Sequence, residues 1–269
     1  MPEGHTIHRL ARDHRPLLVG RPVSTSSPQG RFATGAELLT GRVVERVEPY
    51  GKHLFYVFAG ELLLHVHLGL YGKWQGGSGL PPEPRGALRV RMTTAVEHGA
   101  VWLDLRGPTA CEVMTPPERD LVLARLGPDP LRRDADPERA WARVSRSRRA
   151  VGELLMDQRV LCGLGNIYRA EVLFRAGLSP FAPGTTLTRQ VWEPMWEDLR
   201  ALLRAGVRQR RIVTTEREDR GRRSGTPTRA DAHYVYRRAG LPCRRCGTGV
   251  RTQPMQQRNL FWCPACQPA

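Results

Sequence analysis

Residues 157–171 read Asp157-Gln-Arg-Val-Leu-Cys-Gly163-Leu-Gly165-Asn166-Ile-Tyr-Arg-Ala-Glu171. Gly163 and Gly165 permit a tight turn, and the residues after Asn166 have helical periodicity. The stretch therefore predicts a turn that leads directly into a helix. Asn166 and its neighbouring N–H groups are placed to hold a phosphate at the start of that helix. Gly-x-Gly-Asn alone is a weak signal, and it gains weight only from the rest of the chain.

Helical spacing extends to both sides of this turn. Val151–Arg159, Asn166–Ala176 and Arg189–Arg208 predict the helices of a mostly α-helical domain. Residues 216–233 are polar and poor in apolar side chains, which predicts a mobile loop.

The first 125 residues have a different pattern. Apolar residues at roughly helical spacing, closed by Gly20, predict a helix over residues 4–18. Short β-type runs separated by turn residues follow and predict an antiparallel β-sandwich. These runs are Arg42–Glu48, His53–Phe58, Glu61–Leu68, Ala87–Met92, Val101–Leu105 and Cys111–Met114.

The pattern breaks at Leu126–Leu131, where the sequence is Leu-Gly-Pro-Asp-Pro-Leu. We therefore expect an α+β multidomain chain: a β-sandwich domain over residues 1–125 and a linker over 126–149 that leads into or contains a helix. A helical domain over 150–234 and a cysteine-rich module over 235–269 complete it.

Four cysteines near the C-terminus have the spacing of a metal site. Cys243 and Cys246 form one Cys-x2-Cys pair and Cys263 and Cys266 another, with sixteen residues between the pairs. Two such pairs give four thiolates to one tetrahedral Zn²⁺ and leave no open position. We expect one structural zinc that holds a β-hairpin too small to fold alone. The alternatives are four unligated cysteines that have this spacing by chance and a redox role for one pair.

The charge of the chain points to a polyanionic partner. It has 42 Lys and Arg against 26 Asp and Glu, a net charge of +16, and only Lys52 and Lys73 are lysines. Nucleic acid is the first candidate partner. An acidic membrane surface is the rival partner, but no apolar run approaches the ~20 residues that span a bilayer, and no basic amphipathic tail stands out. The N-terminus has no secretory layout, so we expect a cytoplasmic protein in which Cys111 and Cys162 are ordinary apolar residues.

Three segments together resemble the formamidopyrimidine-DNA glycosylase and endonuclease VIII family. They are Met1-Pro2-Glu3-Gly4, residues 157–171, and the C-terminal run from Val235-Tyr236 through Arg258 to Cys266-Gln267, in the family's order over the whole chain. The resemblance implies a helix–two-turn–helix at 157–171 and a zinc finger after it. It also implies a monomeric, nucleoid-associated enzyme of base excision repair that binds damaged DNA in duplex, bubble or single-stranded form.

Within this resemblance Pro2 is the nucleophile. It becomes N-terminal when Met1 is removed, and an α-amino group, with a reference pKa of about 7.7–8, is partly neutral at physiological pH. A secondary amine that attacks the sugar C1′ forms an iminium, which allows proton loss from C2′ and departure of the 3′ phosphate. Glu3 is implied as the proton carrier, although by spacing alone it is a helix-dipole residue. Lys52 matches the family's lysine that contacts the damaged nucleotide or its phosphate, whereas Lys73 is expected to be solvated.

The resemblance also implies the DNA contacts. Asn166 and Arg258 are expected to hold phosphates, although any one arginine is more often a solvated surface cation. An enzyme that flips a base must fill the hole, and Leu70 and Tyr71 fit that wedge, with burial under the sandwich as the alternative. Arg106 is expected to face the orphaned base.

Two departures from the family pattern bear on the substrate. His5-Thr6 stands where the family usually has Pro-Glu, and Arg106 is followed by Gly-Pro-Thr where the family has a second arginine and an aromatic. Both favour the endonuclease VIII-like branch and oxidised pyrimidines. His5 and His8 are expected on a solvated helix face. The alternative function is a non-catalytic binder of damaged or structured DNA; a generic zinc-ribbon protein would leave residues 163–168 unexplained.

Overall fold

The computed structural model describes residues 2–95, 100–222 and 224–268. Contacts divide the chain into two compact units, Met1–Arg125 and Leu126–Ala269, and each is described by itself. No helix in the described residues is long and apolar enough to cross a bilayer.

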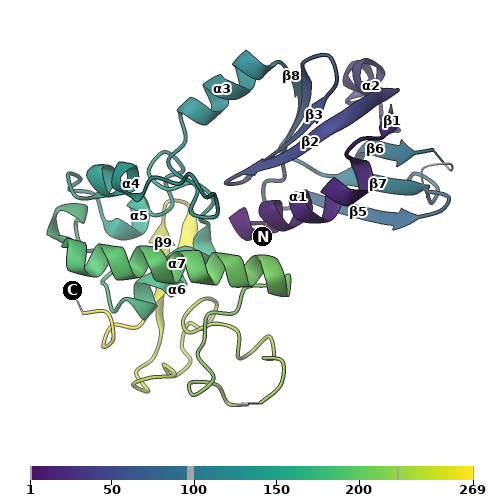
Figure 1. Cartoon of the computed structure of the whole chain (residues 1–269). Coiled ribbons are helices and arrows are strands. Elements are labelled where there is room, and N and C mark those ends of the chain that lie inside the picture. Colours follow the sequence, from purple (N-terminus) through teal and green to yellow (C-terminus); the bar gives the residue numbers. More distant parts are fainter. Residues whose placement is uncertain (1, 96–99, 223, 269) are drawn as a thin grey trace. The chain divides into compact units, whose positions relative to one another are not determined.

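The first unit is an antiparallel β-sandwich with helices around it, as predicted (Figure 1). Its eight strands pair in the order β5-β7-β6-β1-β2-β3-β4-β8, and two residue pairs between β1 and β2 join the two four-stranded halves. The helices are α1 (Gly4–Leu18), α2 (Ala33–Leu39) and α3 (Pro116–Ala124). The strands are β1 (Pro22–Ser26), β2 (Arg42–Tyr50), β3 (His53–Phe58), β4 (Leu62–His67), β5 (Lys73–Ser78), β6 (Leu88–Thr94), β7 (Val101–Arg106) and β8 (Ala110–Met114).

Successive side chains of strand β3 point to opposite faces of the sheet, and both sets are buried. Leu54, Tyr56 and Phe58 lie in the main core between the two halves, against α1. Phe55 and Val57 face the other way into a second cluster that α3 covers. Each fully buried side chain of this size contributes roughly 1.5–3 kcal/mol, so the β2–β3–β4 region is a rigid support for the turn at its end.

The second unit is helical and ends in a two-stranded hairpin. Its elements are α4 (Pro137–Val144), α5 (Val151–Leu154), α6 (Asn166–Arg175), the short 3-10 helix η2 (Gly184–Thr186), α7 (Arg189–Gln209), β9 (Arg251–Met255) and β10 (Arg258–Trp262). Ala140 and Val144 of α4 are buried with Trp192 and Trp196 of α7, so the stretch 126–149 is a folded part of this unit.

The prediction of a helix over Val151–Arg159 is wrong beyond Leu154. Asp157 and Gln158 close two consecutive turns in its place, because their side chains accept hydrogen bonds from backbone N–H groups of Arg159 and Gly163 at 3.0 Å each. Described residues in 216–233 form neither helix nor strand.

Candidate functional site

The chain begins with a buried carboxyl group. Pro2 is half-buried and Glu3 is fully buried at 0% exposure. Glu3 is the N-cap of α1: its carbonyl accepts from Thr6 N at 2.8 Å, but its side chain makes no cap bond. The carboxyl is therefore withdrawn from solvent one residue away from the candidate nucleophile. This placement suits proton transfer better than stabilisation of a helix dipole.

His5 is not on a solvated helix face, and that expectation is wrong. The residue is 5% exposed, although helical spacing places it away from the side of α1 that carries the buried Ile7 and Leu10. Burial, followed by the charge of Arg9, lowers the pKa of His5 to about 4. A neutral imidazole thus lies two residues after Glu3, at a position where the family usually has proline. His8 is half-exposed.

Lys52 lies in a two-residue turn between β2 and β3. Tyr50 and His53 pair across it, and Gly51 has φ 55°, as the first position of a type II′ turn requires. The turn projects Lys52 from the end of the rigid β2–β3 pair.

Leu70 and Tyr71 lie at the tip of a tight loop after β4. The N–H of Gly72 donates to the carbonyl of Leu68 at 2.9 Å and closes the loop. Leu70 is 38% exposed and Tyr71 86% exposed, so neither is buried under the sandwich. Gly69 has φ 64° and packs against the side chain of Thr109, where a Cβ atom would lie within bonding distance of its hydroxyl. The loop therefore requires glycine at position 69 in order to adopt the conformation that exposes Leu70 and Tyr71.

Arg106 ends β7 with its guanidinium occupied within the sandwich. It donates to Asp104 Oδ2 at 3.0 Å, to Gln75 Oε1 at 3.1 Å and to the carbonyl of Arg85. Asp104 is 1% exposed and also takes two bonds from Arg91, at 2.7 and 2.9 Å. Contact between Arg106 and a base would require these bonds to be exchanged.

Asn166 connects α6 to the C-terminal hairpin. Its Nδ2 donates to the carbonyl of Asn259 at 2.9 Å, and its Oδ1 accepts from Arg169. Because the side chain is buried and engaged, a phosphate at this point would be held by backbone N–H groups of the first turn and not by the amide. Of the two glycines before it, only Gly163 is left-handed, with φ 91°.

Arg258 lies at the tip of the hairpin. It pairs with Met255 across Gln256 and Gln257, whose φ values of 51° and 56° are those of a type I′ turn. Its guanidinium donates to the carbonyl of Gln257 at 3.2 Å. The side chain is half-exposed, and no described carboxylate forms an ion pair with it.

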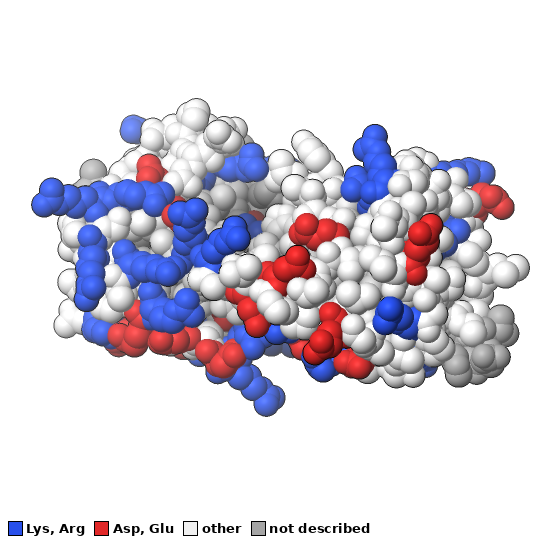
Figure 2. Space-filling view, turned by 90° about the horizontal axis from the view of Figure 1, so that it is seen from above, with Lys and Arg blue, Asp and Glu red and all other residues white. Residues whose placement is uncertain are grey.

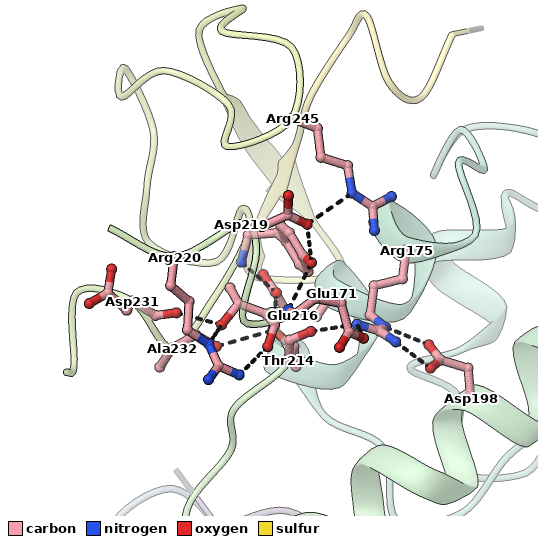
Figure 3. A network of polar contacts seen from close by, with 12 residues as sticks. Glu171, Arg175, Asp198, Thr214, Glu216, Asp219, Arg220, Asp231, Ala232 and Arg245 are labelled. Atoms are coloured by element: carbon pink, nitrogen blue, oxygen red, sulfur yellow. Dashed lines mark hydrogen bonds and ion pairs between the residues drawn. The ribbon is translucent and has the colours of Figure 1, made fainter. Parts of the chain in front are cut away.

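Glu171 is the centre of a buried polar network (Figure 3). Its carboxylate accepts from the backbone N–H groups of Tyr234, Val235 and Tyr236 at 2.7 to 2.9 Å, and from the hydroxyl of Thr214. Thr214 in turn bonds to the carbonyl of Ala232. Glu171 therefore braces the fold and ties the two ends of the loop 215–233 to α6.

The four cysteine thiols form one cluster. Their Sγ atoms all lie within 4.8 Å of one another, with Cys243 to Cys266 at 3.8 Å and Cys246 to Cys263 at 3.4 Å. A tetrahedral Zn–S length of about 2.3 Å places sulfurs about 3.8 Å apart, so the residues fit one structural zinc. Cys162 is buried and Cys111 partly buried, as expected of apolar residues, and burial raises the pKa of Cys111 to about 12.

A histidine cluster in the first unit was missed by the sequence analysis. His53, His65 and His67 lie on β3 and β4, and Glu112 lies beside them on β8. The signal was available, since three of the eight histidines fall within fifteen residues at alternate positions.

Three family models match the chain in order. They are the formamidopyrimidine-DNA glycosylase N-terminal domain over residues 1–111, the H2TH domain of the same family over 126–217, and a zinc finger found in FPG and IleRS over 240–269. The chain is also 51% identical to endonuclease 8 1 of Mycobacterium tuberculosis, over 99% of this chain and all of that one. The chain belongs to the formamidopyrimidine-DNA glycosylase family.

Further members agree with this assignment. DNA-(apurinic or apyrimidinic site) lyase Nei2 of Mycolicibacterium smegmatis is 35% identical over the full length of both chains. The Lactococcus lactis Fpg, solved in complex with DNA that contains an abasic site, superposes with a TM-score of 0.82 at 21% identity, over 99% of this chain and all of that one, and shows that the fold is shared.

Proposed function

We propose that this family member excises damaged bases through a Schiff base on Pro2 and then cleaves the strand by β- or β,δ-elimination. Membership of the family makes it a DNA glycosylase and abasic-site lyase of base excision repair. The observation that carries the proposal is the start of the chain, where a half-buried Pro2 adjoins the fully buried carboxyl of Glu3. Pro2 supplies the amine, and Glu3 carries protons during ring opening and elimination.

The proposed DNA contacts come from both units. Lys52 contacts the damaged nucleotide or its phosphate from the β2–β3 turn. Leu70 and Tyr71 fill the hole left by the flipped base, which their exposure at a loop tip supports. In the second unit, the first turn of α6 at Asn166 and the guanidinium of Arg258 hold phosphates. Arg106 completes the set, provided that it leaves Gln75 and Arg85.

The distribution of charged residues between the two units supports DNA binding mainly by the second unit. The second unit carries 27 Lys and Arg against 14 Asp and Glu, the first 15 against 12. Figure 2 shows basic side chains gathered on one face, at the left, where Figure 1 has α4 and α5. Phosphate neutralisation is therefore expected mainly from the second unit, and chemistry from the first.

The protein is proposed to act as a monomer. Oxidised pyrimidines are proposed as its main substrates, because His5-Thr6 and the sequence after Arg106 depart from the family pattern. A panel of oligonucleotides tests the catalytic activity and the substrate preference. Each carries one oxidised pyrimidine, one 8-oxoguanine or one abasic site, in duplex, bubble or single-stranded form, without added metal. Cleavage of abasic DNA with preference for pyrimidine lesions is expected. Tight binding without cleavage of any substrate would favour the non-catalytic binder.

A further inference from the structure

Five polar and aromatic side chains continue the second apolar cluster of the sandwich toward the turn that carries Lys52. Phe55, His65 and Glu112 lie opposite one another on β3, β4 and β8, and His53 lies opposite His67. Alternation along a strand puts all five on one face, with Phe55 packed against α3 and the ring of His65 stacked on it at 4.9 Å.

The imidazoles are linked in series. Glu112 Oε1 lies 2.8 Å from His65 Nδ1, and His65 Nε2 lies 2.9 Å from His53 Nδ1. The His65 side chain is 5% exposed between an exposed carboxylate on the edge strand and the half-buried His53. This series of hydrogen-bonded side chains thus crosses three strands, from the solvent-exposed Glu112 to His53, the residue that follows Lys52.

Hydrogen-bond chemistry fixes which nitrogen donates and which accepts at each step of this series. A carboxylate only accepts, so His65 Nδ1 donates to Glu112. A neutral ring then has an accepting Nε2, so His53 Nδ1 donates to it, and the Nε2 of His53 is left with a lone pair. His67 has the opposite tautomer, because its Nδ1 accepts from the N–H of Gly69 at 3.2 Å and its Nε2 therefore carries the proton.

The rings stay neutral in this environment. Burial, followed by the charges of His65, His67 and Lys52, lowers the pKa of His53 to about 3. Burial and then Lys52 lower that of His67 to about 4. Burial also lowers the pKa of His65, against the opposing effect of Glu112. Lys52 is close enough to affect two of the three rings.

We propose that His65 and Glu112 are positioning residues that hold His53 in the Nδ1–H tautomer, so that its Nε2 accepts a hydrogen bond from the Lys52 ammonium and fixes the direction of that side chain. The proposal rests on the role assigned to Lys52 above. His65 and Glu112 do not touch the substrate themselves. In other sites, carboxylate and histidine partners orient a functional imidazole in the same way.

The tautomers are directly measurable. Long-range ¹⁵N–¹H spectra of the full-length, zinc-loaded protein labelled with ¹⁵N-histidine, with signals assigned through His53→Gln and His65→Phe, are expected to show Nδ1–H for His53 and His65 and Nε2–H for His67. Glu112→Gln should leave His53 divided between two tautomers, since an amide can donate as well as accept. An Nε2–H His53 in the wild-type protein overturns the proposal. This readout needs no activity, so it is separate from any failure of the proposed function.

Kinetics test the connection to Lys52. Glu112→Gln and His65→Phe, which keeps the ring stack, are expected to lower the single-turnover rate of base removal about tenfold, with DNA affinity unchanged. Glu37→Gln makes the same charge change on the exposed face of α2 and is expected to leave the rate unchanged. In a Lys52→Gln background, Glu112→Gln should cause no further loss. Unchanged rates in both variants, or a full tenfold loss in that background, overturn the proposal.

Discussion

At the scale of single residues, Glu171 shows how one buried carboxylate organises a region without secondary structure. Three consecutive backbone N–H groups and one hydroxyl converge on it. Around it, Arg175 pairs with Asp198 at 2.7 Å and with Glu216 at 2.8 Å, which fixes the end of α6 against α7 and the loop (Figure 3). Because the carboxylate is fully buried, its removal leaves several donors without an acceptor.

We predict that Glu171→Gln destabilises the second unit by about 2–4 kcal/mol, since the amide presents a donor to backbone donors in a buried site. Urea unfolding measures the change. Glu193→Gln is the matched control: this carboxylate on α7 is 64% exposed and pairs only at 3.5 Å, and its loss should change stability by less than about 0.5 kcal/mol. Equal effects of the two substitutions would contradict the role of Glu171.

Single residues differ in how far the sequence predicts them. The cysteine spacing is a local signal, and the four thiols lie together as predicted. The link from His53 to His65 depends on strand register, and the commitment of Asn166 to Asn259 joins residues 93 positions apart. Neither contact can be derived from local pattern, because both are set by how elements pair.

At the scale of elements, the strongly periodic segments were predicted and the weakly patterned ones were missed. Strand β5 contains Gly76 and Gly77 and lies at an edge with most side chains exposed, so it has no alternating apolar pattern. A Cβ atom at Gly76 would lie 2.4 Å from the Cδ2 atom of Leu103 on β7, so the Leu103 side chain would have to move. Strand β1 has five residues of which only two are buried.

Substitutions at Asn166 and Arg258 should distinguish a structural contribution to DNA binding from a direct contact with DNA. Arg258→Ala is expected to weaken binding and to reduce the salt dependence by about one phosphate contact without a change in stability. Asn166→Ala is expected to weaken binding and also to lower the unfolding temperature, because α6 loses its bond to β10. Fluorescence anisotropy at several salt concentrations and thermal unfolding measure these effects. Loss of stability in Arg258→Ala alone would reverse the two roles.

The hairpin as an element depends on its metal. We predict one zinc per chain by elemental analysis and, after chelation, loss of the β9–β10 fold together with DNA binding, because four thiolates join the two ends of so small a module. Cys162→Ser serves as the control outside the cluster. A zinc-free protein that keeps its hairpin and its DNA affinity would contradict a structural metal.

At the scale of the whole molecule, several buried histidines make stability depend on pH. Burial lowers the pKa of His14 to about 4, and His5, His53 and His67 are lowered in the same direction. In the unfolded chain each titrates near 6.5, so between about pH 6.5 and 4 the unfolded state binds more protons and stability falls as the pH falls.

The unfolding temperature should therefore decrease from pH 7.5 to 5.5, above the range in which carboxylates titrate. His14→Gln should reduce this slope, since His14 is 5% exposed and bonded to Tyr56 at 2.7 Å. Differential scanning calorimetry at four pH values measures it. A flat profile in the wild-type protein would show that these rings are not neutral in the folded state.

The central claim is that Pro2 is the nucleophile, and borohydride trapping on abasic DNA tests it most directly. An iminium between the amine and C1′ is reduced to a stable amine, which gives a covalent protein–DNA complex independent of the base released. Wild-type protein should form this complex and cleave the strand, and both should vanish when removal of Met1 is blocked, because Pro2 then has no free amine. Lys52→Gln should still be trapped on preformed abasic sites. Robust trapping by a protein with a blocked Pro2, lost on substitution of Lys52, would contradict the account.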